Sequence, residues 1–228
     1  MNREFIKPEY DRALEHTGRK KIVQAIARAG GTARFSVISR MTGVADNVLM
    51  HHLNVLRQYG IVEQIVDGGP YSLRYKTPLC FIFGEKTPEK VSYIGLLGHK
   101  NEREEAETEV ALRLLKKEGI EVNLAYVVTS STAAKTWKDR ALPVSWILVD
   151  GDALTDIDKI ADKVEVVLTE LVRNRLVIMD CTSFNKPATI ALYELAQRYL
   201  IPLIYVYEPK RKLKWLISKE HLLQRFNI

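Results

Sequence analysis

Beyond Pro78 the chain alternates short apolar runs with longer amphipathic segments, and this alternation limits the fold more than any other feature. The run Leu176–Met179 is apolar at every position, which is typical of a strand buried on both faces of a parallel sheet. Repeated strand–helix units predict a largely parallel sheet with right-handed crossovers, that is, a Rossmann-like three-layer α/β domain. The expected strands are Val91–Leu97, Val122–Thr129, Ser145–Val149, Arg175–Asp180 and Leu203–Tyr207, and the expected helices are Glu102–Glu118, Ala133–Asp139, Asp156–Val172 and Pro187–Tyr199. The segment Lys210–Ile217 predicts an edge strand, followed by a final helix that reaches Phe226.

The first third of the chain follows a different pattern, in which helices precede a hairpin. The third of these helices carries Val48, Leu49, Leu53 and Leu56 at helical spacing, so these side chains are expected to face inward. A glycine-rich turn then separates two β-rich runs, which predicts a hairpin. This order of elements is that of a winged helix-turn-helix: two helices, a turn, a third helix and a two-stranded wing. The expected helices are Asp11–Ala29, Phe35–Met41 and Ala45–Tyr59, and the expected strands are Ile61–Val66 and Tyr71–Tyr75, joined by Asp67–Gly69.

The two patterns divide the 228 residues into two domains, 1–80 and 81–228, joined by a hinge around residues 77–90 that contains Pro78, Gly84 and Pro88. The net charge of +6 divides unevenly between them. Residues 1–80 hold 12 Lys and Arg against 7 Asp and Glu, a balance of +5, whereas residues 81–228 hold 22 against 21, a balance of +1. A small basic domain joined to a nearly neutral one is typical of a nucleic-acid-binding domain coupled to another function.

Several classes of protein are excluded by the sequence. No apolar run approaches the roughly 20 residues that a membrane-spanning helix needs, and the charged N-terminus lacks the apolar core of a secretory signal. Cys80 and Cys181 form no C-x-x-C pair, which argues against a disulfide framework or a thiolate metal site. His51 and His52 point about 100° apart on a helix, so they cannot both bind one metal ion. A soluble cytoplasmic protein with no membrane contact, metal or cofactor is therefore expected.

The third helix is the candidate DNA-contacting element. With its apolar side facing inward, its outer side can enter the major groove, where Asn pairs with adenine and Arg with guanine or phosphate. The residues expected to contact double-stranded DNA from this helix are Asn47, Met50, His51, Asn54 and Arg57. Arg74 and Lys76 from the wing are expected to contact the DNA backbone or the minor groove, and Arg34 and Arg40, which flank the second helix, are also expected to contact DNA.

Over about 70 residues this domain resembles the ArsR/MarR-like winged-helix regulators. Their third helix commonly ends in a pattern like H-L-x-x-L-x-x-x-G-hydrophobic, and this chain has His52-Leu53-Asn-Val-Leu56-Arg-Gln-Tyr-Gly60-Ile61. The resemblance implies a DNA-binding dimer. The alternative is a winged helix that serves protein–protein contact.

In an open parallel sheet, ligands bind beyond the carboxyl ends of the strands, near the point where the strand order reverses. Three expected strand ends carry polar residues suited to an anion such as phosphate. The candidate ligand-binding residues are Gly98, His99, Lys100 and Asn101 after the first strand, Thr129, Ser130 and Ser131 after the second, and Thr182, Ser183, Phe184, Asn185 and Lys186 after the fourth. Neither G-x-G-x-x-G nor a P-loop is present, which argues against a dinucleotide cofactor or NTP hydrolysis.

At these loops the second domain resembles the CARF family, the Rossmann-like ligand-sensing domains of CRISPR-associated proteins. The run Asp180-Cys-Thr-Ser-Phe-Asn-Lys186 is similar to the family's D-x-T-G-G-T-K-like motif, with Ser183-Phe184 in place of Gly-Gly, and Gly98-His99-Lys100-Asn101 is similar to its G-[FHN]-x loop. The resemblance spans roughly residues 91–208. It implies a homodimer that binds cyclic oligoadenylate across the dimer, and in some members slow cleavage of that ligand.

A purely structural interpretation of these residues stays open beside the functional one. The segment Thr129–Thr132 also has the composition of a helix N-cap. Lys186 could be an ordinary surface lysine, and Asp180 could serve only to orient its loop. His99 has no second catalytic group beside it in the sequence, so no residue is assigned a catalytic role.

The leading hypothesis is a CRISPR-associated, ligand-responsive transcription regulator in antiviral defence, which binds DNA as a homodimer and senses a cyclic oligoadenylate. The alternatives are a ring nuclease that cleaves this ligand, and a DNA-binding protein whose second domain is a ligand-free dimer scaffold.

Overall fold

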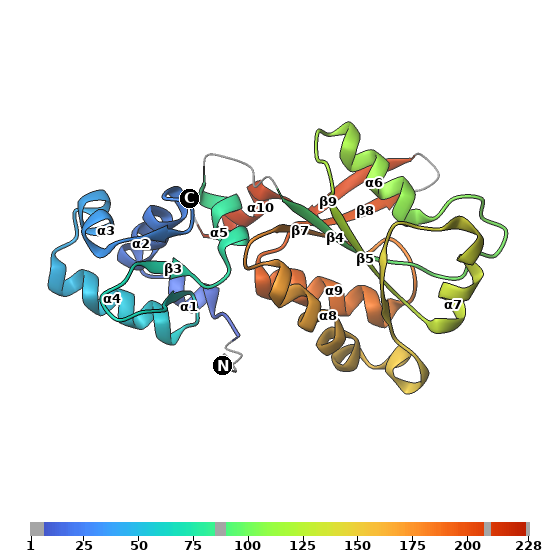
Figure 1. The fold of residues 1–228 in the computed structure, drawn as a ribbon, viewed down its shortest axis with the longest axis horizontal. Coiled ribbons are helices and arrows are strands. Elements are labelled where there is room, and N and C mark those ends of the chain that lie inside the picture. Colours follow the sequence, from blue (N-terminus) through green and yellow to red (C-terminus); the bar gives the residue numbers. More distant parts are fainter. Residues whose placement is uncertain (1–6, 85–89, 208–210, 227–228) are drawn as a thin grey trace. The chain divides into compact units, whose positions relative to one another are not determined.

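Figure 1 shows the computed structural model of the chain, which describes residues 7–84, 90–207 and 211–226. The chain forms two units. The first unit contains the described residues 7–84, 172–174 and 219–226, and the second contains 90–171, 175–207 and 211–218.

The first unit is a winged helix-turn-helix, as its sequence pattern predicts. Ile22 and Ile26 of α2, Ile38 of α3, and Leu49 and Leu53 of α4 are fully buried and form its core. The strands form an antiparallel sheet in the order β1-β3-β2. The elements are α1 (Tyr10–Leu14), α2 (Thr17–Arg28), β1 (Thr32–Ala33), α3 (Phe35–Thr42), α4 (Asp46–Gln58), β2 (Val62–Gln64), β3 (Tyr71–Leu73), α5 (Lys76–Phe83) and α10 (Lys219–Arg225).

The first unit differs from its predicted elements at several places. The single helix expected over Asp11–Ala29 is two helices, because the side chain of His16 caps the start of α2 by accepting the N–H of Gly18. Helix α5 occupies the first half of the expected hinge, since a proline in the first turn of a helix removes no helical hydrogen bond. Val48 was expected to face inward and is instead 42% exposed. Pro88 lies outside the described residues.

The second unit is the predicted Rossmann-like α/β domain. Its six strands lie in the order β6-β5-β4-β7-β8-β9, and every neighbouring pair is parallel except β8 and β9. Helices α8 and α9 cover one face of the sheet and α6 covers the other (Figure 1). The elements are β4 (Val91–Leu96), α6 (Glu107–Lys117), β5 (Leu124–Thr129), α7 (Ser131–Thr136), β6 (Ser145–Leu148), α8 (Ile157–Leu171), β7 (Leu176–Asp180), α9 (Lys186–Tyr199), β8 (Leu203–Tyr207) and β9 (Lys212–Ile217), with two short 3₁₀ turns at Lys138–Arg140 and Gly151–Thr155.

The strand order places the switch point between β4 and β7. From β4 the chain builds outward through β5 to β6, and then returns to the other side of β4 with β7. The loops that follow β4 and β7 therefore leave the same edge of the sheet side by side. Helix α6 begins at Glu107 and not at the expected Glu102, so the loop after β4 is longer than predicted.

Candidate functional site

Helix α4 has an outward side that carries all five of its predicted DNA-contacting residues. Leu49, His52, Leu53 and Leu56 are buried on the opposite side of this helix. The predicted residues Asn47, Met50, His51, Asn54 and Arg57 are all exposed. The helical spacing of the buried residues of α4 thus leaves two amides and one guanidinium on a single accessible side of the helix.

Of the four basic residues predicted outside α4, two are exposed and two are not. Arg34, at the N-cap of α3, lines a small pocket of ≈ 390 Å³ together with the wing turn Gly68–Pro70, and Arg40 is exposed on α3. Arg74 has a side chain only 13% exposed and pairs with Glu63 at 3.9 Å. Lys76 is half-buried at the first turn of α5. The structure thus brings Arg34, and not Arg74 or Lys76, to the tip of the wing.

The two adjacent histidines of α4 point in different directions. His51 is exposed, whereas His52 is buried with its ring centroid 4.6 Å from that of His16. Burial lowers the pKa of His52, and the nearby His16, His51 and Arg19 lower it further. Among the described residues, no three His, Cys, Asp or Glu side chains are grouped so that they could hold a metal ion.

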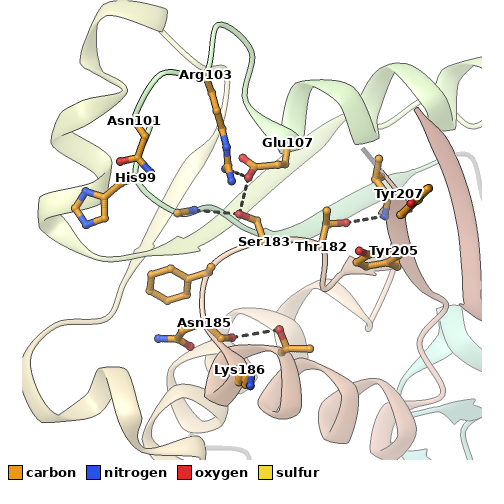
Figure 2. Close-up of a pocket in the computed structure, with 14 residues that line it drawn as sticks. His99, Asn101, Arg103, Glu107, Thr182, Ser183, Asn185, Lys186, Tyr205 and Tyr207 are labelled. Carbon is orange, nitrogen blue, oxygen red and sulfur yellow. Dashed lines mark hydrogen bonds and ion pairs between the residues drawn. The ribbon is translucent and has the colours of Figure 1, made fainter. Parts of the chain in front are cut away.

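The second unit has an open pocket of ≈ 760 Å³ at the switch point, between the loops after β4 and β7 (Figure 2). Eight predicted ligand-binding residues line this pocket: Gly98, His99, Asn101, Thr182, Ser183, Phe184, Asn185 and Lys186. The structure thereby joins two segments that lie about 80 residues apart in the sequence.

The other four predicted ligand-binding residues lie outside the lining and have structural partners. Lys100 forms an ion pair with Asp139. Thr129 is fully buried, and its hydroxyl donates a hydrogen bond to the carbonyl of Leu97 at 2.6 Å. Ser130 caps α7 by accepting the N–H of Ala133, and Ser131 bonds to Asp150. For the loop after β5, the helix-cap interpretation therefore describes the observed contacts.

Six further residues line the pocket that the sequence did not single out: Arg103, Glu107, Thr189, Tyr205, Val206 and Tyr207. Arg103 and Glu107 were hidden inside a predicted helix, whereas the structure places Arg103 in the loop before α6 and Glu107 at the first position of that helix. Tyr205 and Tyr207 lie at alternate positions of β8, so they share one side of that strand. This period of two was the available signal for them.

A buried hydrogen-bond network fixes the loop after β7. Asp180 is 1% exposed and accepts hydrogen bonds from the hydroxyl of Tyr93 at 2.6 Å and from the backbone N–H and hydroxyl of Thr182. Thr182 in turn accepts the N–H of Val206 at 2.8 Å. Burial raises the pKa of the Asp180 carboxyl, which the hydrogen bonds from Thr182 and Tyr93 oppose. Asp180 thus orients the loop from beneath and does not line the pocket.

The loops after β4 and β7 are tied directly together. The N–H of Gly98 donates to Ser183 Oγ at 3.3 Å, and the indole N–H of Trp137 donates to the carbonyl of Gly98 at 2.9 Å. Ser183 also donates to Glu107 Oε1 at 2.8 Å (Figure 2). The serine that replaces glycine in the family motif is therefore part of the scaffold of the pocket.

Phe184, the second residue of that replacement, has φ of 74°, and the pocket residue Asn101 has φ of 45°. Both conformations lie in the left-handed region, which costs a non-glycine residue of order 1 kcal/mol or more. Such conformations gather at ligand sites more than elsewhere.

The charges of the pocket suit an anion. Lys186 is exposed at the first turn of α9, where the helix N-terminus adds partial positive charge. Arg103 supplies a second cation and is paired with Glu107. Two tyrosines supply flat apolar surface.

The fold and the two sites define a two-unit protein, with a winged helix-turn-helix followed by a Rossmann-like domain that has a polar switch-point pocket. Residues 16–64, from the N-cap of α2 to the end of β2, match the family model described as "Bacterial regulatory protein, arsR family". The chain therefore carries an ArsR-type helix-turn-helix in its first unit. A search of curated proteins found no match to the chain.

Partial likeness to three solved structures accompanies this match. Protein VC1899 from Vibrio cholerae has 12% identity and a TM-score of 0.43, with 57% of this chain and 34% of that chain covered. Can2 from Sulfobacillus thermosulfidooxidans, in complex with cyclic tetra-adenylate, has 11% identity and a TM-score of 0.41, covering 57% and 35%. Csm6 from Enterococcus italicus, bound to cyclic hexa-2′-fluoro-hexa-dAMP, has 12% identity and a TM-score of 0.43, covering 60% and 39%. The match spans little more than a third of each of these proteins.

In the part of the chain that the structure describes, no helix combines the length and the apolar character needed to cross a bilayer.

Proposed function

We propose that the protein is a transcription regulator that binds double-stranded DNA through α4 as a homodimer and responds to a cyclic oligoadenylate bound by its second unit. The observation that carries the DNA-binding part is the position of α4 inside the segment that matches the ArsR family, with its five polar and apolar contact residues on one exposed side. The basic balance of +5 in residues 1–80 supports this assignment.

The contacts of α4 divide into two kinds. Asn47 and Asn54 present amides that can pair with adenine in the major groove. Arg57, with Arg34 and Arg40 outside the helix, suits phosphates, which fix the position of the protein on the duplex without specifying sequence. A dimer would place two copies of α4 in successive major grooves about one DNA turn apart.

The DNA test is fluorescence anisotropy with DNA from the protein's own upstream region, over a range of salt concentrations. Arg57→Ala is expected to weaken binding to all sequences and to reduce the salt slope by about 1, and Asn54→Ala to weaken binding about 10-fold at the preferred sequence only. Lys116→Ala, which removes an exposed cation of α6 in the second unit, is the control and is expected to change neither. Salt-independent or absent DNA binding would refute the DNA-binding function.

The ligand part of the proposal is supported by the resemblance of the loops 98–101 and 180–186 to CARF motifs, and by the pocket that these loops form together. Lys186, the N-terminus of α9 and Arg103 would hold phosphates, and the tyrosines of β8 would lie against bases. A ligand shared between two copies would change the separation of the two α4 helices, and with it the fit to DNA half-sites.

The ligand test is calorimetry with cyclic tetra- and hexa-adenylate. We expect binding by the wild-type protein that Lys186→Ala weakens about 10-fold or more. The control is Lys159→Ala, another lysine in the first turn of a helix, which lies outside the pocket. No heat at high ligand concentration would refute the sensor function, and loss of the cyclic ligand during incubation would favour the ring-nuclease alternative.

A further inference from the structure

Glu107 is the only acidic side chain among the described residues that line the pocket. It is 2% exposed at the first turn of α6. Its Oε1 accepts the hydroxyl hydrogen bond of Ser183, and the carboxylate is paired with the guanidinium of Arg103. Figure 2 shows Arg103, Glu107 and Ser183 pointing toward one another.

The second oxygen of this carboxylate is unsatisfied. Oε2 of Glu107 is buried and has no hydrogen-bond partner among the described residues. An ionised carboxylate can only accept hydrogen bonds, and a buried acceptor without a donor costs about 1–3 kcal/mol, more when it is charged. The large majority of buried polar groups in folded proteins have a hydrogen-bond partner, so a buried carboxylate oxygen without one is a candidate contact for a bound molecule.

Arg103 pairs with Glu107 but is much more exposed to solvent than Glu107 is. The Arg103 side chain is 41% exposed, whereas the Glu107 side chain is 3% exposed. Arg103 lines the same pocket as Glu107. A ligand phosphate would compete with Glu107 for this guanidinium, because phosphate accepts the same bidentate hydrogen bonds. Movement of Arg103 toward such a phosphate would release the carboxylate, whose Oε1 it now pairs with, to accept a hydrogen bond from the ligand.

We propose that Glu107 Oε2 accepts a hydrogen bond from an N–H or O–H group of the bound nucleotide while Arg103 turns to its phosphate. This inference rests on the proposed ligand function and narrows it. A pocket with cations and one buried hydrogen-bond acceptor selects a molecule that carries both an anionic group and a neutral hydrogen-bond donor. Inorganic phosphate alone would therefore not satisfy both kinds of contact. In an adenylate the donor is the ribose 2′-hydroxyl or the 6-amino group of the base.

Calorimetry with three probes distinguishes these two sources. The probes are cyclic tetra-adenylate, its 2′-deoxy analogue, and its inosine analogue, which lacks the 6-amino group. We expect the wild-type protein to bind one analogue about 10-fold or more weakly than the parent ligand, since a charged acceptor then loses its donor. The analogue that binds weakly identifies the donor.

Glu107→Gln tests the role of the carboxylate itself. With the amide oxygen toward Ser183, the amide nitrogen would replace Oε2 and could not accept a hydrogen bond. We expect the preference for the parent ligand to fall below about 3-fold in this variant, as a double-mutant cycle would measure. Glu109→Gln on the same helix, which pairs with Arg140 outside the pocket, is the matched control and is expected to keep the preference.

The outcomes separate this inference from the proposed function. Equal affinity of the wild-type protein for all three probes overturns the inference and leaves the ligand function standing, and this comparison needs no variant. A preference that persists in Glu107→Gln has the same consequence. Failure of the wild-type protein to bind any probe refutes the ligand function, and the inference with it.

Discussion

Any side chain at position 95 would overlap the ring of Tyr93. A Cβ built on Gly95 would fall within about 2.5 Å of the ring carbons Cε1 and Cζ of Tyr93, much closer than side chains tolerate. Glycine at this position lets the Tyr93 hydroxyl reach Asp180 beneath the loop after β7. The shape of the pocket therefore depends on Gly95, a residue that does not line it.

Gly95→Ala is expected to displace Tyr93 and to leave the buried Asp180 carboxyl with one donor fewer. We expect a loss of about 2–4 kcal/mol in the free energy of unfolding, from overpacking and the lost hydrogen bond together. Urea denaturation measures this loss. Gly98→Ala is the control, because its Cβ would approach no heavy atom closer than 3.7 Å, and a loss as large as that of Gly95→Ala would contradict the steric explanation.

At this scale, the polar residues that follow strands included eight that line the pocket and four that do not, and residues that depend on a helix boundary were missed. Thr182, Ser183 and Lys186 were found because polar residues follow an apolar strand. Arg103 and Glu107 were not, since charged residues at helical spacing give no sign of where a helix starts, and α6 starts only at Glu107.

Helix α4 has one exposed side and an opposite side that carries a buried titratable group. His52 is 8% exposed, and its Nδ1 is buried without a hydrogen-bond partner among the described residues. Desolvation therefore favours the neutral imidazole in the folded protein, which lowers the pKa of His52. The stability of this element is thus linked to pH.

The free energy of unfolding is expected to fall as the pH drops below about 6.5, the pKa of histidine in an unfolded chain. The unfolded chain takes up a proton at His52 there, while the folded protein resists it until its lower pKa is reached. His52→Gln is expected to reduce the slope of stability against pH between about 5 and 7. His51→Gln alters the exposed neighbour and is expected to keep the slope, and an unchanged slope in His52→Gln would contradict the assignment.

Among the elements, those with a long and regular apolar period were predicted well. All five expected strands of the parallel sheet and the recognition helix were found, because their apolar patterns span several residues. Helix α5 was missed, since Pro78 and Gly84 indicate a linker as readily as the ends of a short helix. Strand β1 is only two residues long and pairs with β3, a contact that no local pattern reveals.

At the scale of the molecule, the first unit is built from segments that lie far apart in the chain. Helix α10 packs against α5, and Leu222 and Phe226 are 2% and 5% exposed. Arg225 donates two hydrogen bonds to Asp11, at 2.9 and 2.6 Å, and Lys20 donates one to the carbonyl of Phe226. The winged helix thus includes a helix that follows the last strand of the Rossmann-like unit.

A chain that stops after Ser218 is expected to lose about 3 kcal/mol or more of stability in the first unit, from the burial of Leu222 and Phe226. Hydrogen exchange of peptides from α2 and α5 measures this loss, and peptides from β4 and β7 serve as the internal reference. Arg225→Ala removes only a partly exposed ion pair and is expected to cost about 1 kcal/mol or less. Unchanged exchange in α2 and α5 of the truncated chain would show that α10 is dispensable.

The position of α10 also has a consequence for synthesis. As the chain leaves the ribosome, α4 emerges early, but the helix that completes its unit emerges only after every strand of the Rossmann-like unit. A nascent or prematurely released chain would therefore carry α4 in a first unit that lacks α10. Full stability of the first unit would then be confined to polypeptides in which the second unit has already been made.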